Sequence, residues 1–132
     1  SGRVNLVQSL DATPPATSAD RPLLLMALAT AEVQGSQWLD GAQEDDLPAT
    51  VHPDSATGFQ NNDRAVLESE HGRIRVRLVF DSRQRRDVIV VPKGGWLSKG
   101  RCANALIKAR TTDAGDCGVY FDTAVRLNAL PD

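Results

Sequence analysis

Arginine and apolar side chains alternate strictly from residue 73 to residue 78, and this alternation constrains the fold more than any other stretch of the chain. In an extended segment, successive side chains point to opposite faces, so one face is apolar and the other is cationic. The apolar members are Ile74, Val76, Leu78 and Phe80, and the arginines are Arg73, Arg75 and Arg77. Residues 64–70 carry a similar pattern, and His71-Gly72 lies between the two segments. We therefore predict a β-hairpin over residues 64–80.

Further short apolar runs predict the remaining strands. Residues 88–91 are uninterrupted Val and Ile, which is typical of a strand buried on both faces, and Pro92 should end it because proline cannot donate to a ladder. Residues 22–30, 49–51 and 119–127 are the other predicted strands, the first favoured over a helix by its short length and flanking proline. Pro53 and Gly58 bracket a helical turn. Six or seven short strands with one or two very short helices indicate a mainly β barrel.

The 132 residues form one domain by length. Residues 1–21 are rich in Pro, Ala, Ser and Thr, so they are interpreted as a linker or arm, and residues 22–130 as the barrel domain. The first residues, Ser1-Gly2-Arg3, lack a methionine, which indicates a piece of a larger protein. No apolar run is long enough to cross a membrane, and no signal peptide is present. The compartment stays open between cytoplasm and periplasm.

The charges are distributed unevenly along the chain. Residues 73–110 contain eleven Lys or Arg and two acids, a net charge of +9, whereas the remainder carries four basic and fifteen acidic residues, a net charge of −11. Such a split predicts either a site for a polyanion or a surface for a charged partner. Opposite charges that face each other across the fold would explain it equally well. Alternating arginines alone are more typical of a solvated face.

A glycine-rich loop follows the buried strand. Lys93-Gly94-Gly95-Trp96 combines a cation, two residues without side chains and a large flat ring, and Asn104 follows among small apolar neighbours. This combination indicates the rim of a ligand site. Spacing alone favours a simpler interpretation, a turn with a packing tryptophan.

The sequence contains no self-contained catalytic motif. His52 and His71 sit beside turn residues, and no phosphate-binding glycine motif is present. Cys102 and Cys117 are too few for a metal site, and whether they pair stays open. The basic strand lacks the interleaved aromatic residues that nucleic-acid binding would use. The residues alone therefore support a barrel that binds an anionic ligand, not a catalyst.

The order of the segments resembles a known family. The series runs from PLLL through a polar loop to HPDSA, a turn ending at Asp63, the arginine hairpin, VIVVPKGGW, NAL and YFDTAVRL, over about residues 22–127. It is similar to the C-terminal molybdopterin (guanine) dinucleotide-binding domain of molybdopterin oxidoreductases, the dimethyl sulfoxide reductase superfamily. The resemblance implies a double-psi β-barrel that covers one side of a bis-molybdopterin guanine dinucleotide.

The resemblance also implies a context and a set of contacts. The chain would be part of a prokaryotic-type anaerobic redox enzyme whose other domains hold molybdenum or tungsten and, in some members, an iron–sulfur cluster. Those domains would be its partners, with no nucleic acid, no membrane contact, no metal ligand and no catalytic activity in the isolated domain. The implied cofactor contacts fall in three places: Thr30, Gly35, Ser36 and Gln37; Trp96 and Asn104; and Tyr120 and Phe121.

A second interpretation comes from a different class. A stand-alone double-psi barrel that binds a protein or peptide would use the +9/−11 charge asymmetry as a partner surface. The two interpretations differ in whether Ser36, Gln37 and Asn104 face one shared cleft.

Overall fold

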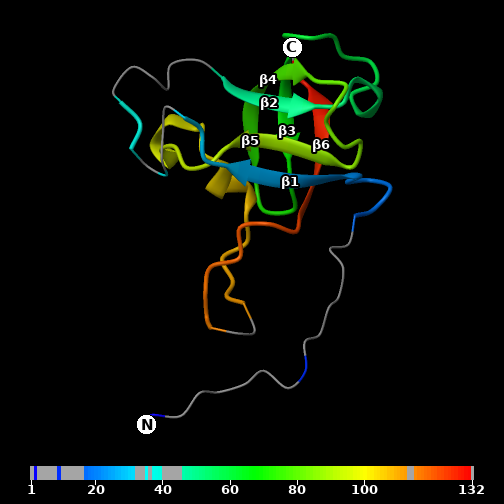
Figure 1. The fold of residues 1–132 in the computed structure, drawn as a ribbon. Coiled ribbons are helices and arrows are strands. Elements are labelled where there is room, and N and C mark those ends of the chain that lie inside the picture. The colour runs from blue at the N-terminus through cyan, green and yellow to red at the C-terminus, as the bar shows by residue number, and fades with distance from the viewer. Residues whose placement is uncertain are drawn as a thin grey trace.

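Two parallel strand pairs determine how the sheet closes. The computed structural model describes residues 2, 9, 17–31, 35, 37–39, 46–112 and 115–131. Its strands are β1 (Leu23–Leu28), β2 (Leu47–Val51), β3 (Arg64–Glu68), β4 (Arg73–Phe80), β5 (Val88–Pro92) and β6 (Thr123–Ala129). They form a closed barrel in the order β1-β5-β2-β4-β3-β6 (Figure 1). The prediction of a mainly β, double-psi barrel is confirmed.

The parallel pairs join strands that are distant in the chain. β1 pairs with β5 from Leu24↔Val88 to Leu28↔Pro92, and β2 pairs with β4 from Leu47↔Val76 to Val51↔Phe80. The remaining neighbours are antiparallel. Because a parallel pair requires a crossover connection, both pairs force long segments across an end of the barrel.

The alternation in β4 sets the inside and outside of the barrel. Ile74, Val76 and Leu78 are buried, and the arginines between them are exposed. β5 is buried along both faces, as predicted, and ends at Pro92. The apolar core draws on all six strands and on Leu106 from the loop that follows β5.

Short 3-10 helices occupy the connections. They are η1 (Pro53–Ser55), η2 (Leu97–Lys99) and η3 (Ala103–Leu106), three in the described part of the chain rather than the one or two predicted. Pro53 opens η1, as predicted, and the Nδ1 atom of His52 accepts a hydrogen bond from the Asp54 backbone N–H at 3.1 Å. His52 therefore has a structural role as the cap of a helical turn.

The predicted start of the last strand is wrong. Residues 119–122 precede β6, which runs from Thr123 to Ala129. Asp122 adopts a φ of 74°, which is incompatible with a continuous strand. Val119 instead donates its backbone N–H to the Arg110 carbonyl at 3.1 Å, so this segment folds back on the chain before β6 begins.

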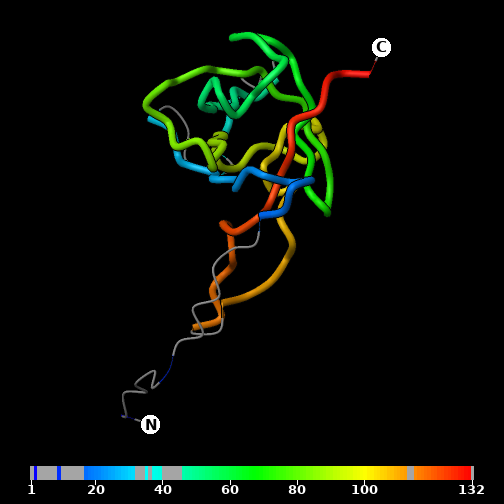
Figure 2. Tube along the Cα trace, turned by 90° about the vertical axis from the view of Figure 1, so that its right-hand side faces the viewer, coloured from blue at the N-terminus to red at the C-terminus, as the bar shows by residue number. Residues whose placement is uncertain are grey.

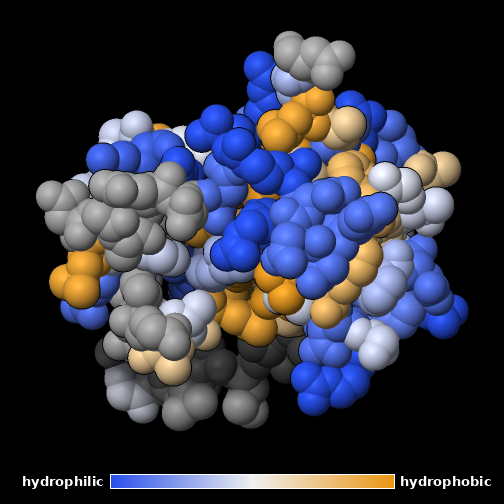
Figure 3. Space-filling view, turned by 90° about the horizontal axis from the view of Figure 1, so that it is seen from above, coloured by the Kyte–Doolittle hydropathy of each residue, from blue (hydrophilic) through white to orange (hydrophobic). Residues whose placement is uncertain are grey.

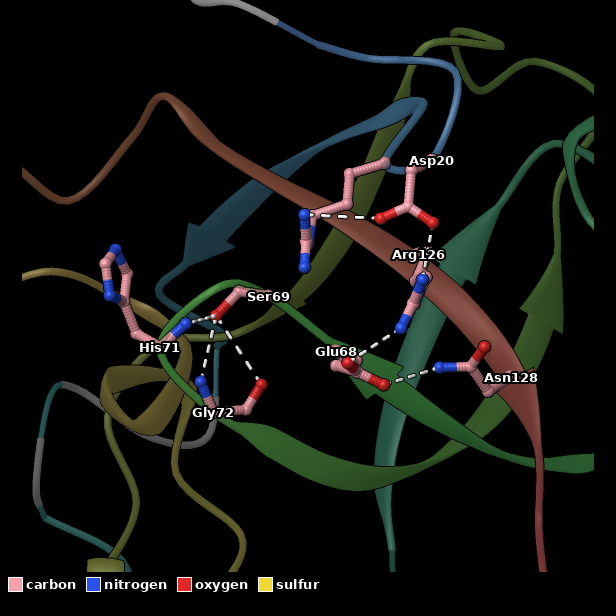
Figure 4. Close-up of polar contacts among 8 residues, drawn as sticks. Asp20, Glu68, Ser69, His71, Gly72, Arg126 and Asn128 are labelled. Atoms are coloured by element: carbon pink, nitrogen blue, oxygen red, sulfur yellow. Dashed lines mark hydrogen bonds and ion pairs between the residues drawn. The ribbon is translucent and has the colours of Figure 1, made fainter.

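An ionic network secures the chain where it enters the barrel. Arg126 on β6 bonds to Asp20 and to Glu68 on β3, the latter at 2.9 Å, and Asn128 donates to Glu68 at 2.8 Å (Figure 4). These hydrogen bonds, above all the one that Arg126 donates to Glu68, raise the pKa of Arg126. Most of the predicted arm, residues 1–21, lies outside the described residues, and the domain limits stay predictions.

The turn between β4 and β5 is also rich in ion pairs. Arg83 meets Asp81 at 3.1 Å, Arg85 meets Asp87 at 2.6 Å, and Arg86 meets Asp54 at 2.9 Å. The hydrogen bonds from these guanidinium groups lower the pKa of Asp81 and of Asp87. Each arginine of this turn is therefore neutralised within the chain.

The outer surface is mixed in character. Seen from above the view of Figure 1, hydrophilic residues cover much of the surface and apolar residues show between them (Figure 3). Within the described ranges, no helix has the length and apolar character needed to cross a membrane.

We predict that Arg83→Gln raises the pKa of Asp81 toward its ordinary value, because the strongest cause of the lowering is the Arg83 hydrogen bond. The pKa of Asp81 is lower in the folded wild type than in the unfolded chain. The Arg83–Asp81 pair therefore stabilises the fold fully at a pH above the unfolded pKa, and this contribution is lost as the pH falls through the folded pKa. Carboxyl NMR titration measures the shift. Arg77→Gln serves as the control, and an unchanged Asp81 titration in Arg83→Gln would contradict the assignment.

Candidate functional site

The strand directions bring three separate connections to one end of the barrel. Because β1 and β5 are parallel, the segments that follow them leave from the same end. β6 is antiparallel to β1, with Leu25 opposite Thr123, so the residues that lead into β6 arrive at that end too. The predicted site residues all belong to these connections, and topology alone therefore places them in one region.

Two direct contacts hold these connections together. Gly94 approaches Gly35 so closely that a Cβ atom on Gly94 would lie 1.8 Å from the Gly35 carbonyl oxygen. The Nζ atom of Lys93 lies 4.5 Å from the centre of the Tyr120 ring, a cation–π contact. The loop after β1, the glycine loop and the segment before β6 thus form one continuous structure.

The two glycines serve chain packing rather than an open cradle. Gly94 and Gly95 have φ values of 86° and 96°, a region that residues with side chains rarely adopt. A Cβ on Gly95 would lie 2.4 Å from the Arg101 carbonyl oxygen. The close backbone approaches of these two glycines are therefore made to Gly35 and Arg101 of the same chain.

A pocket of about 550 Å³ lies beside this structure. Its lining combines an amide, two cations, a hydroxyl and an aromatic ring with a few apolar groups. The lining residues are Asn104, Ile107, Lys108, Ala109, Arg110, Thr111, Gly118, Val119 and Tyr120. The volume falls in the range of small-molecule sites. Such a lining can bind a flat heterocycle and a neighbouring anionic group.

One wall of the pocket is a projecting hairpin, which we define as residues 107–122. Thr111 and Gly118 form a β-bridge, and Thr112 donates its backbone N–H to the Cys117 carbonyl at 2.8 Å. The orange segment in Figures 1 and 2 extends away from the barrel in both views. Tyr120 packs over Gly118, where a Cβ would lie 3.3 Å from the ring. The hairpin therefore presents a flat ring and two cations beside the barrel end.

The structure brings some of the predicted site residues together and leaves others apart. Asn104 and Tyr120 line the pocket. Gly35 contacts the glycine loop, whereas Thr30 and Gln37 are exposed on the connection after β1. Trp96 and Phe121 are exposed but do not line the pocket. Ser36 lies outside the described residues.

Several lining residues were not predicted from the sequence. In the sequence, Lys108 and Arg110 are distinguished only as members of the +9 segment. No sequence pattern identifies Thr111, Gly118 and Val119 as pocket residues. The available clue was the run of small and polar residues around Gly115 and Gly118, which is typical of a hairpin.

The turn between β3 and β4 holds η3 in place. The Ser69 hydroxyl accepts hydrogen bonds from the backbone N–H groups of His71 and Gly72 and donates one to the Leu106 carbonyl at 2.8 Å. Figure 4 shows Ser69 facing His71 and Gly72. A Cβ on Gly72 would lie 2.3 Å from the Ala105 carbonyl oxygen. Because η3 also carries Asn104, this turn positions one wall of the pocket.

The other reactive groups do not form a site of their own. Cys102 is a buried free thiol and Cys117 is an exposed one. Across the described ranges, no three His, Cys, Asp or Glu residues gather in a way that could hold a metal ion.

The chain is similar to a protein family and to solved structures. A family model described as "Molydopterin dinucleotide binding domain" matches residues 28–124. Among solved structures, acetylene hydratase from Pelobacter acetylenicus matches with a TM-score of 0.71 at 18% identity, covering 83% of this chain and 18% of that chain. The chain thus spans less than a fifth of that enzyme's length, and at this identity the likeness shows the fold alone. A search of curated proteins finds no match.

We predict that Ser69→Ala lowers the free energy of unfolding by about 1–3 kcal/mol, because it leaves the Leu106 carbonyl and two backbone N–H groups without their partner. Chemical denaturation measures the change. Ser82→Ala, at an exposed position, is the matched control and should change stability by less than about 0.5 kcal/mol. Equal effects in the two variants would contradict the role of Ser69.

We also predict that Gly94→Ala destabilises the protein more than Gly100→Ala. Both glycines have positive φ, but a Cβ on Gly100 would meet nothing within 4 Å, so that variant reports backbone strain alone, about 1–2 kcal/mol. Gly94→Ala adds the clash with Gly35, about 1–3 kcal/mol more. Denaturation of both variants tests this, and a cost no greater than that of Gly100→Ala would show that the two loops do not depend on this contact.

Proposed function

The chain belongs to the family of molybdopterin dinucleotide-binding domains, and we propose that it holds one side of a bis-molybdopterin guanine dinucleotide in a molybdenum or tungsten oxidoreductase. The matched residues, 28–124, include β5, the glycine loop, η3 and the projecting hairpin. The family resemblance read from the sequence is confirmed by this match. The cofactor would supply redox chemistry at a metal held by other domains.

The observation that carries the proposal is the composition of the pocket. Asn104 can donate to and accept from the edge of a guanine or pterin ring, because an amide carries both functions. Lys108 and Arg110 supply positive charge for a pyrophosphate. Tyr120 offers a ring face on which a flat heterocycle can stack. The residues of the pocket therefore fit a heteroaromatic dinucleotide.

The neighbouring loops extend the proposed contact surface. Gly35 is fixed against Gly94, and the exposed Trp96 follows directly after the glycine loop. We assign Thr30, Gln37, Ser36 and Phe121 to the same surface on the family resemblance. Arg110 is held by Asp122 at 3.6 Å, which orients its guanidinium group beside the pocket.

The proposal places catalysis outside this chain. In this account the domain orients and shields the dinucleotide, while the metal ligands, any iron–sulfur cluster and the substrate channel belong to partner domains. The isolated domain would then show no oxidoreductase activity.

We predict that Asn104→Ala weakens retention of molybdopterin guanine dinucleotide about tenfold, the loss expected for one to two hydrogen bonds. The chain is incubated anaerobically with cofactor released from a molybdenum enzyme and passed through gel filtration. Pterin fluorescence after oxidation and guanine nucleotide content then measure what is retained.

Gln60→Ala is the matched control, because it removes an exposed amide at the opposite end of the barrel, before β3. This variant should retain as much cofactor as the wild type. Retention that is equal in all three proteins, or absent in all three, would overturn the proposed site.

A further inference from the structure

The outer face of β4 carries a row of arginines away from the pocket. Arg73, Arg75 and Arg77 are exposed, and Arg64 on β3 lies directly opposite Arg77. We call these four residues the arginine strip. Along a strand, alternate residues are about 7 Å apart, so the strip extends for about 14 Å. It is a row of exposed guanidinium groups on two neighbouring strands.

Within the described part of the chain, the strip is only partly neutralised. The Asp46 carboxylate forms ion pairs with two arginines of the strip, Arg64 at 2.6 Å and Arg75 at 3.3 Å. Among the described residues, the side chains of Arg73 and Arg77 make no hydrogen bond or ion pair. The residue opposite Arg73 is Glu68, but its carboxylate is bound by Arg126 and Asn128. The strip therefore retains an excess of positive charge.

The turn between β4 and β5 provides an internal contrast. Its three arginines each pair with an aspartate of the same chain. In the arginine strip, by contrast, Arg64 and Arg75 share the single aspartate Asp46. A general excess of arginine therefore does not explain the strip.

Arg64 faces Arg77 directly across the strand pair, and like charges at such positions are destabilising. Asp46 compensates the charge of Arg64 at 2.6 Å, whereas the guanidinium group of Arg77 has no such partner among the described residues. A bound anion at Arg77 would reduce the remaining repulsion.

Asp46 shows which anion the strip accepts. Its carboxylate is almost fully buried although both partner arginines are more than half exposed. Guanidinium groups match carboxylates in planar geometry. The strip already binds one carboxylate, and Arg73 and Arg77 can bind others on either side.

We propose that the arginine strip docks a carboxylate-rich polypeptide surface. β4 is paired on both sides, so the partner binds through side chains and adds no strand to the sheet. The outward residues of β3 and β4 include no aromatic side chain on which a base could stack, and the chain carries a net charge of −2, which disfavours a nucleic acid. A partner with acidic side chains at alternate positions matches the spacing.

The test uses a labelled peptide of about ten residues that alternates glutamate and threonine, to match the 7 Å spacing. Fluorescence anisotropy measures its binding to the wild-type chain, to R73Q/R77Q and to the control R83Q/R85Q. Both double variants remove two charges. R73Q/R77Q keeps the Asp46 ion pairs, so we expect it to fold and to melt no lower than the wild type.

We expect R73Q/R77Q to weaken peptide binding at least about tenfold and R83Q/R85Q to stay within about twofold of the wild type. Equal losses of peptide affinity in the two variants would overturn the proposal. So would the absence of peptide binding to the wild type at salt concentrations below about 0.05 M, where charge interactions are screened least. A single-stranded oligonucleotide of equal charge that binds more tightly and depends on Arg73 and Arg77 would also overturn it. Cofactor retention should not change in R73Q/R77Q, which separates this proposal from the function of the pocket.

Discussion

The parallel pairing of β1 with β5 is the constraint on which the rest of the structure depends. It aligns the carboxyl ends of two strands more than sixty residues apart in the chain, from Leu24↔Val88 to Leu28↔Pro92. With β6 antiparallel to β1, the three connections that build the pocket meet at one barrel end. A simple antiparallel meander would have sent these connections to alternating ends. The site is therefore a product of strand order, and the side chains only decide what it binds.

Close backbone contacts then make this end of the barrel rigid. Gly94 against Gly35, Gly95 against Arg101 and Gly72 against Ala105 are approaches that any side chain would block. The Ser69 hydroxyl adds three hydrogen bonds that tie the β3–β4 turn to η3. The Ser69 and Gly72 contacts keep Asn104 in place before a ligand arrives, and the contact with Lys93 positions the Tyr120 ring. Pre-organisation of this kind reduces the entropy that binding must overcome.

The sequence predicted the barrel better than it predicted the pocket. The alternation in Arg73–Phe80 and the apolar run at Val88–Pro92 depend directly on which side chains are buried. The strands, and from them the fold, could therefore be predicted from the sequence. The start of β6 could not be predicted, because Val119, Tyr120 and Phe121 have high β-propensity but precede the strand, and Val119 bonds to Arg110 instead of the barrel. Lys108 and Arg110 become pocket residues only through the Thr111–Gly118 bridge, a contact that periodicity cannot reveal. Tyr120 was found through the family resemblance, whereas Asn104 was indicated both by its place after the glycine-rich loop and by the resemblance.

The position of the projecting hairpin in the chain affects how such a domain can evolve. It lies between η3 and β6, contributes no strand to the closed barrel, and supplies most of the pocket lining. Insertions and deletions are tolerated where few buried contacts depend on the affected backbone. The length and the charge of residues 107–122 can therefore change while the six strands stay intact. Selection can alter the ligand that the pocket binds without changing the residues that form the barrel.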